Sequence, residues 1–204
     1  MRHARVSGAL RRVGVRRPRL LAVAVPVAFA LSSVAVVGAT APGFSSASAH
    51  KVQPQPRPGT CHARGTGLDE RPDPRCTPGL RNPAVTPRTI FSTICKSGWT
   101  SKVRPPESIT AKEKRASMAA YGDTGSSSTL EYDHFIPLEL GGAVNAAGNL
   151  WPEPDYAHPS AFYLNPKDHL EDALKHLVCS GRMPLATAQK LIVTNWVIAY
   201  RRYG

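Results

Sequence analysis

Acidic residues are scarce in this chain, and its first 49 residues contain none. The 204 residues include 26 Lys and Arg but only 14 Asp and Glu, a formal net charge of +12. Seven of the arginines lie in residues 1–49, which leaves residues 50–204 with a net charge of +5. A large positive charge is typical of proteins that bind polyanions. Because more than half of it lies in the N-terminal segment, charge alone does not identify a partner.

Charged residues are also absent from the largely apolar run of residues 20–39, and Ala47-Ser-Ala49 follows it just before His50. A basic start, an apolar stretch and an A-x-A site are typical of a secretory signal peptide, so we predict that residues 1–49 are one, cleaved after Ala49. The alternative is an uncleaved membrane anchor, because the run is about as long as the ~20 residues that span a bilayer. In either case the arginines keep the N-terminus inside, and residues 50–204 are exported.

Cysteine is rare and no C-x2-C pair occurs, which argues against zinc bound by cysteines. The four cysteines, Cys61, Cys76, Cys95 and Cys179, all lie in the exported part, where disulfides are stable. Four cysteines permit three pairings. We favour Cys61–Cys76, which closes a local loop, and Cys95–Cys179, which ties the start of the folded domain to a late helix.

Residues 50–90 lack any sustained helical or alternating period, and they contain eight prolines. We predict a linker segment of turns whose order depends on the first disulfide. The folded domain is predicted over residues 91–204, and the chain is too short for two large domains. The sequence of this domain contains no helix-turn-helix or zinc-finger motif that would recognise a DNA sequence.

The pattern of residues 107–121 predicts a helix that stops at Gly122. Ser108 or Thr110 would be its N-cap, with Glu113 in reach for a capping box. The other expected elements are strand-like segments over 130–137 and 149–152, a helix that begins at Asn165-Pro166 and ends at Gly181, and a helix over about 184–202. The mixture predicts an α+β fold in which the last two helices pack as a hairpin.

The most informative segment is Asp133-His-Phe-Ile-Pro-Leu-Glu-Leu-Gly-Gly142, followed seven residues later by Asn149-Leu150. It resembles the HNH endonucleases, whose ββα-metal site reads D-H-x-x-P-L-x-x-G-G, then N-L, then a helix that supplies a further ligand. Flanking motifs such as Cys76-Thr-Pro-Gly79 and Lys167-Asp-His-Leu-Glu171 resemble a narrower group of secreted bacterial HNH-like proteins. The resemblance covers about residues 76–203.

The resemblance implies a small ββα-metal core with additional helices, and a secreted, metal-dependent endonuclease that hydrolyses phosphodiester bonds in DNA, with RNA as another substrate. This hydrolysis needs a water molecule, a base and a cation. His134 suits the base, with an ordinary pKa of about 6.5. Asp133 is a hard oxygen ligand, which points to Mg²⁺ or Mn²⁺. Asn149 would orient the base-bearing loop, or would only bond local backbone in a turn.

Neighbouring side chains on a strand point to opposite faces, so Asp133 and His134 share a site only if the strand bends or twists. The third metal ligand is expected early in the following helix, where Asn165, Asp168 and His169 are candidates. We choose His169, because Asn165 is already explained as an N-cap. A site that none of the three reaches would be degenerate, which would favour an inactive protein.

Two other functions remain open. The chain could be a catalytically inactive secreted module that keeps the HNH scaffold and binds nucleic acid or a cell-surface polyanion. It could also be a disulfide-stapled envelope protein. Five basic residues could contact phosphates, although scattered surface cations are common: Lys167, Arg182, Lys190, Arg201 and Arg202. No protein partner can be inferred, and a membrane is a partner only if the N-terminal segment is uncleaved.

Overall fold

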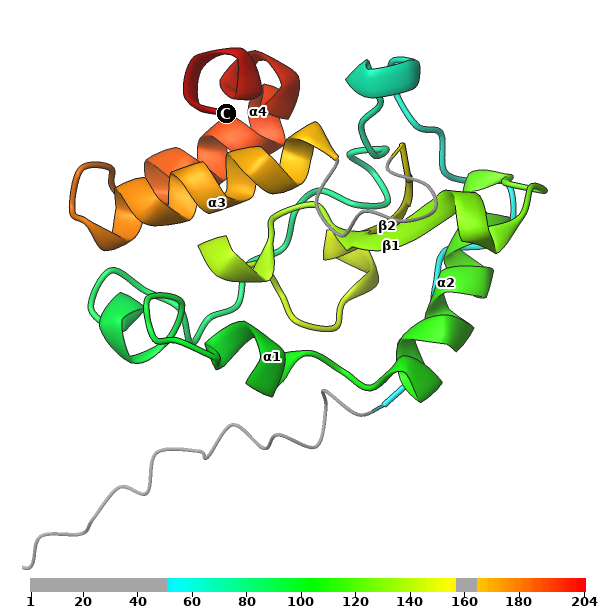
Figure 1. Cartoon of the computed structure of the whole chain (residues 1–204). Helices are drawn as coiled ribbons and strands as arrows, with labels where there is room; N and C mark the ends of the chain where they lie inside the picture. The colour runs from blue at the N-terminus through cyan, green and yellow to red at the C-terminus, as the bar shows by residue number, and fades with distance from the viewer. Residues whose placement is uncertain (1–50, 157–164) are drawn as a thin grey trace, which may run out of the picture. The chain divides into compact units, whose positions relative to one another are not determined.

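The fold is described for residues 51–156 and 165–204 in a computed structural model (Figure 1). These residues belong to one unit, Phe44–Gly204. The predicted signal peptide or anchor, residues 1–49, lies outside the described residues. Within the described ranges, no helix has both the length and the apolar character needed to cross a membrane.

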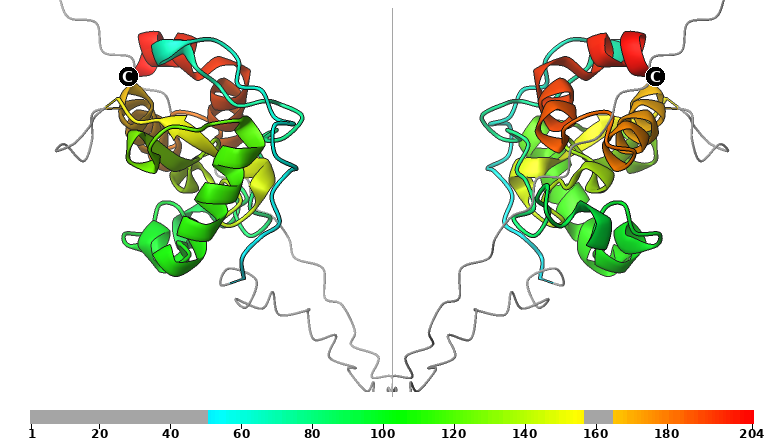
Figure 2. Two further views of the ribbon diagram at one scale, coloured as in Figure 1. Left: turned by 90° about the vertical axis from the view of Figure 1, so that its right-hand side faces the viewer. Right: turned by 90° about the vertical axis from the view of Figure 1, so that its left-hand side faces the viewer.

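The described chain combines a two-stranded antiparallel sheet with four α-helices, which confirms the α+β class. The elements are α1 (Trp99–Val103), α2 (Glu107–Tyr121), β1 (Leu130–His134), β2 (Leu150–Pro154), α3 (Pro166–Cys179) and α4 (Leu185–Tyr203). The sheet lies between α2 on one side and α3 on the other, and α4 runs beside α3 (Figures 1 and 2).

Helix α2 has the predicted ends, and Gly122 stops it in a left-handed conformation with φ of 76°. Its N-cap is Pro106, so the prediction of Ser108 or Thr110 was wrong. Proline presets extended backbone just before the helix, and the Pro106 carbonyl accepts the first helical hydrogen bond, from the Ile109 N–H at 2.9 Å. No side-chain cap is needed to begin the helix there.

Helices α3 and α4 form the predicted hairpin, and their apolar faces make most of the core. The buried side chains include Phe135, Ile136, Leu140, Trp151, Leu170, Leu174, Val178, Ile192 and Trp196. Helix α4 is broken at Asn195, where φ is −167° and ψ is 95°. The Asn195 Oδ1 accepts hydrogen bonds from the Val197 and Ile198 N–H groups and so caps the last two turns.

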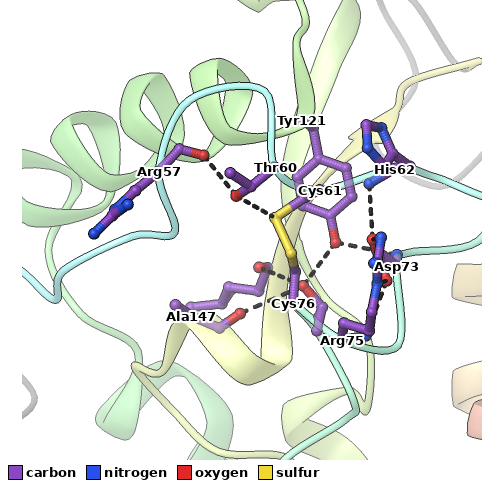
Figure 3. The surroundings of a disulfide bond; sticks show 11 residues. Arg57, Thr60, Cys61, His62, Asp73, Arg75, Cys76, Tyr121 and Ala147 are labelled. Atoms are coloured by element: carbon purple, nitrogen blue, oxygen red, sulfur yellow. Dashed lines mark hydrogen bonds and ion pairs between the residues drawn. A yellow bond between two sulfur atoms is a disulfide. The ribbon is translucent and has the colours of Figure 1, made fainter.

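Both predicted disulfides, Cys61–Cys76 and Cys95–Cys179, are confirmed. The first closes a loop within the proline-rich segment, and a hydrogen bond from the Cys61 N–H to the Ala120 carbonyl at 3.0 Å holds this segment to the end of α2. Figure 3 shows the Tyr121 hydroxyl of α2 beside this disulfide, where it accepts from the Asp73 N–H at 3.2 Å. Residues 51–90 are mostly turns and irregular structure packed on the domain, and Val85 belongs to the core.

Candidate functional site

The turn after β1 depends on a close backbone approach that only glycine allows. Strand β1 ends at His134, and β2 returns with His134 opposite Leu150. A Cβ on Gly142 would overlap the Ile136 carbonyl oxygen and come within 2.6 Å of the Asn149 Nδ2. The second glycine of the Gly-Gly pair is therefore required for the loop between the strands to close.

Asn149 holds this loop with its side chain. It is fully buried, and its Oδ1 accepts a hydrogen bond from the Ile136 N–H at 2.9 Å. Its Nδ2 donates to the Ile136 carbonyl at 3.0 Å and to the Ala143 carbonyl at 3.1 Å. One amide therefore fixes the backbone just after His134 to the backbone just before Val144, which is a positioning contact rather than a contact with reacting atoms.

Val144 holds His134 in one tautomer, and Asn149 positions the backbone just before Val144. Its Nε2 lies 2.9 Å from the Val144 carbonyl oxygen. A carbonyl can only accept, so Nε2 must carry the proton, and Nδ1 is the ring nitrogen with the lone pair. Burial lowers the pKa of His134 to about 4, and the Val144 hydrogen bond and the Asp133 charge oppose this shift only in part. The imidazole is therefore neutral at neutral pH.

Asp133, by contrast, is bound to a lysine. The Lys167 side chain in the first turn of α3 is 1% exposed, and its Nζ forms an ion pair with the Asp133 Oδ2. The same Nζ donates to the Glu171 Oε1 at 2.6 Å and to the His134 carbonyl at 3.1 Å. The Glu153 Oε2 of β2 lies 3.6 Å away. One ammonium thus collects three carboxylates at the end of β1.

Burial dominates the protonation of this cluster. It raises the pKa of Glu171 to about 8 and that of Glu153 well above its ordinary value, against the attraction of Lys167. Burial would also raise the pKa of Asp133, but the Lys167 ammonium outweighs it and the pKa is lowered. Lys167 stays protonated because the surrounding carboxylates outweigh the effect of burial and raise its pKa. The balanced ion pair is therefore Lys167 with Asp133.

Two further carboxylates border the cluster. Burial, followed by repulsion from Asp133, raises the pKa of Asp168 to about 6. Repulsion from Asp133 is the main reason that the pKa of Glu131, on the exposed part of β1, rises to about 7. This side of β1 is acidic, and a polyanion approaching it would be repelled in the absence of a cation.

The structure does not bring the predicted metal ligands together. Asp133 is bound to Lys167, and His169 is exposed on α3. Asn165 is the N-cap residue of α3, as predicted, but it is buried, and its Oδ1 accepts the Tyr156 N–H at 3.2 Å and makes no capping hydrogen bond. Among residues 51–156 and 165–204, no group of three His, Cys, Asp or Glu side chains could hold a metal ion. The described residues therefore do not fit the predicted metal centre.

Sequence reasoning missed Lys167, Glu153 and Glu171, and it was wrong to place Lys167 on the surface. The signal was present in α3, where Leu170 and Leu174 define the buried face. Lys167 lies one turn before Leu170 on that face, and Glu171 lies one turn after Lys167. A charged residue at helical spacing from the buried apolar residues of a helix indicates a buried ion pair.

Comparison with known proteins identifies no relative. No protein-family model matches the chain, and neither a curated protein nor a solved structure is significantly similar to it. The case for any function therefore rests on the residues and on the geometry around His134.

Proposed function

We propose that the chain is an exported HNH-type endonuclease that hydrolyses phosphodiester bonds in DNA, with His134 as the general base. The observation that supports this most directly is the Nε2 contact of His134 with the Val144 carbonyl, which directs the basic lone pair to Nδ1. Three residues of the motif, Asp133, Gly142 and Asn149, hold the end of β1 and the loop beside this histidine. Two disulfides are compatible with an extracellular protein.

In the proposed reaction, the His134 Nδ1 removes a proton from the attacking water as the water adds to phosphorus and the P–O bond to the leaving oxygen breaks. Asn149 and Val144 hold the imidazole in the required tautomer and orientation. Lys167 holds Asp133 and the His134 carbonyl, which fixes the end of β1. Asn149 and Lys167 are both positioning residues, since neither is exposed to a substrate.

The Mg²⁺ or Mn²⁺ expected from the resemblance remains a prediction, and we assign it no step because the described residues do not form its ligand set. The acidic border of Glu131, Asp133 and Asp168 gives a physical reason to test it. A cation at that border would reduce the repulsion between these carboxylates and an anionic substrate.

The deciding experiment is the nicking of supercoiled plasmid by the purified exported protein with Mg²⁺, with Mn²⁺ and with EDTA. The His134→Gln variant keeps an N–H that can reach Val144 but has no base, so we expect its nicking rate to fall about 10²–10⁴-fold. His176→Gln, at an exposed position on α3, is the matched control and should cut like the unmodified protein. Equal nicking by both variants would refute the base assignment.

The second candidate is an inactive HNH scaffold that binds nucleic acid or a cell-surface polyanion. It is favoured by one observation, the commitment of Asp133 to Lys167 while His169 faces solvent. It predicts retention of DNA in a gel-shift assay at low salt with no nicking under any metal condition. Salt-sensitive binding without cleavage would replace the enzyme proposal with this one.

A further inference from the structure

Glu113, in the middle of α2, is a buried acidic residue that has no counter-ion among the described residues. Four charged residues are buried within the described ranges. Asp73 pairs with Arg75, and Glu153 lies beside Lys167. Glu113 is 0% exposed and forms no ion pair with any residue of 51–156 or 165–204. An ionised carboxylate removed from water is costly unless something balances its charge.

The two oxygens of Glu113 differ in their surroundings. Oε1 accepts hydrogen bonds from the Gln53 N–H at 2.6 Å and from the Asn145 Nδ2 at 3.2 Å. Oε2 has less than 1 Å² of accessible area and no hydrogen-bond partner among the described residues. The expected capping box is wrong, because Glu113 reaches a segment 60 residues away instead of the start of its own helix.

Two more side-chain oxygens in the same cluster are also buried without a partner, the Asn145 Oδ1 and the Gln55 Oε1. Their amide nitrogens are already used, since Asn145 donates to the Lys51 carbonyl at 2.9 Å and Gln55 donates to the Tyr132 hydroxyl at 3.0 Å. The Lys51 carbonyl, which can only accept, fixes which end of the Asn145 amide is the oxygen, and the Gln53 carbonyl, 3.4 Å from the Gln55 Nε2, does the same for Gln55. Gln53 also donates its N–H to Glu113, so the Gln55 amide and the Tyr132 hydroxyl lie close to the same carboxylate.

We infer that the Glu113 Oε2, the Asn145 Oδ1 and the Gln55 Oε1 form a binding site for a hard cation of the Ca²⁺ type. None of the three oxygens has a hydrogen-bond donor among the described residues, and an acceptor that is buried without a donor is costly. Carboxylate and carboxamide oxygens are the ligands that Ca²⁺ prefers. Mg²⁺ retains several waters and fits poorly where the oxygens have no access to water.

The site joins four parts of the chain near His134 without using its catalytic geometry. Gln55 comes from the N-terminal proline-rich segment, Glu113 from α2, Tyr132 from β1 and Asn145 from the loop between the strands. Asn145 directly follows Val144, whose carbonyl holds His134. A bound cation would therefore stiffen the loop that positions the proposed base, although the inference does not depend on the proposed function.

Two measurements on the purified protein test the site, after removal of cations with a chelator. Ca²⁺ at ten times a Kd of about 10⁻⁴–10⁻³ M should raise the Tm by about 3–6 °C. Tb³⁺, which substitutes for Ca²⁺, should show emission sensitised by Tyr132. Glu113→Gln should abolish both effects, and Glu107→Gln, an exposed position on the same helix, should leave both unchanged.

A second variant keeps the test decisive if Glu113→Gln does not fold. Gln55→Ala removes one ligand from the surface segment, and it should weaken Ca²⁺ binding about tenfold while the protein stays folded. The inference fails if Ca²⁺ leaves the Tm unchanged and Tb³⁺ gives no sensitised emission. It also fails if Glu113→Gln is as stable as the unmodified protein in Ca²⁺, because the Glu113 carboxylate would then contribute nothing to cation binding.

Discussion

The two faces of β1 treat buried negative charge in different ways. On the α3 face, three carboxylates surround the Lys167 ammonium, so the chain supplies its own cation. On the α2 face, Glu113 has two hydrogen-bond donors but no cation among the described residues. The comparison shows that hydrogen bonds to a buried carboxylate do not replace a counter-ion. Only the α3 face has a counter-ion of its own, and the α2 face needs a ligand to supply one.

Removing the ammonium from the α3 face should produce the largest effect. Lys167→Met leaves Asp133, Glu153 and Glu171 buried around an uncharged side chain, so we expect a loss of about 3–5 kcal/mol in the free energy of unfolding at pH 7. Urea denaturation measures it, with Lys190→Met at an exposed position as the control. The loss should shrink in mild acid, because Asp133 in the variant no longer faces the Lys167 ammonium, and its burial favours the neutral form. A loss below about 1 kcal/mol would mean that the cluster is not charged as described.

The titratable groups on the two faces of β1 should change the free energy of unfolding with pH in opposite directions. His134 lies on the face opposite Asp133. His134 has a folded pKa of about 4 against an ordinary 6.5, so the unfolded chain binds more protons between these values. Its contribution is complete above about pH 6.5 and is lost as the pH falls to about 4, by about 3 kcal/mol. Unfolding free energies at stepped pH should show this loss, and His134→Gln should remove it.

On the other face, the pKa of Glu171 is raised to about 8 against an ordinary 4.5. The folded chain therefore binds more protons than the unfolded chain between these values, and stability falls as the pH rises through that range. Glu171→Gln should remove this alkaline part of the profile and leave the acid part unchanged. If His134→Gln and Glu171→Gln changed the free energy of unfolding over the same pH range, the pKa directions given for these two residues would be wrong.

A substitution of Asn149 tests whether the loop beside His134 depends on the hydrogen bonds of the Asn149 amide. Asn149→Ala leaves the buried Ile136 N–H without its acceptor, and we expect a loss of about 2 kcal/mol. The proposed nicking activity should fall with little change in substrate affinity, because His134 is displaced and the DNA contacts are not. Thermal unfolding and a comparison of kcat with KM measure the two effects. An unchanged kcat in a folded variant would argue against a positioning role.

Local patterns in the sequence were sufficient for much of the fold. The period of residues 107–121 and the glycine after them predicted α2, because amphipathic spacing and a left-handed stop are local properties. The pairing of Cys61 with Cys76 followed from their closeness in the chain. The 130–137 segment was predicted as strand-like, and β1 occupies its first five residues. Alternation placed Asp133 and His134 on different faces, which agrees with their different partners.

The charged contacts were harder to predict because they join distant segments. Glu113 was assigned a role within its own helix, and the structure pairs it with Gln53 and Asn145 instead. His169 was chosen from the spacing of the family motif, but Leu170 and Leu174 set the rotation of α3 and turn His169 to solvent. Burial of an apolar stripe outweighs the preference of any single polar side chain on the same helix.

The Cys95–Cys179 disulfide also has a topological consequence. It links residues 84 positions apart, so β1, β2 and the loop that carries Asn149 all lie inside one covalent ring. A single cut by a protease between residues 96 and 178 opens that ring but releases no fragment. Outside the cell, where proteases are common and reductants are scarce, the cut molecule would stay in one piece, and only a reducing agent would separate its two parts.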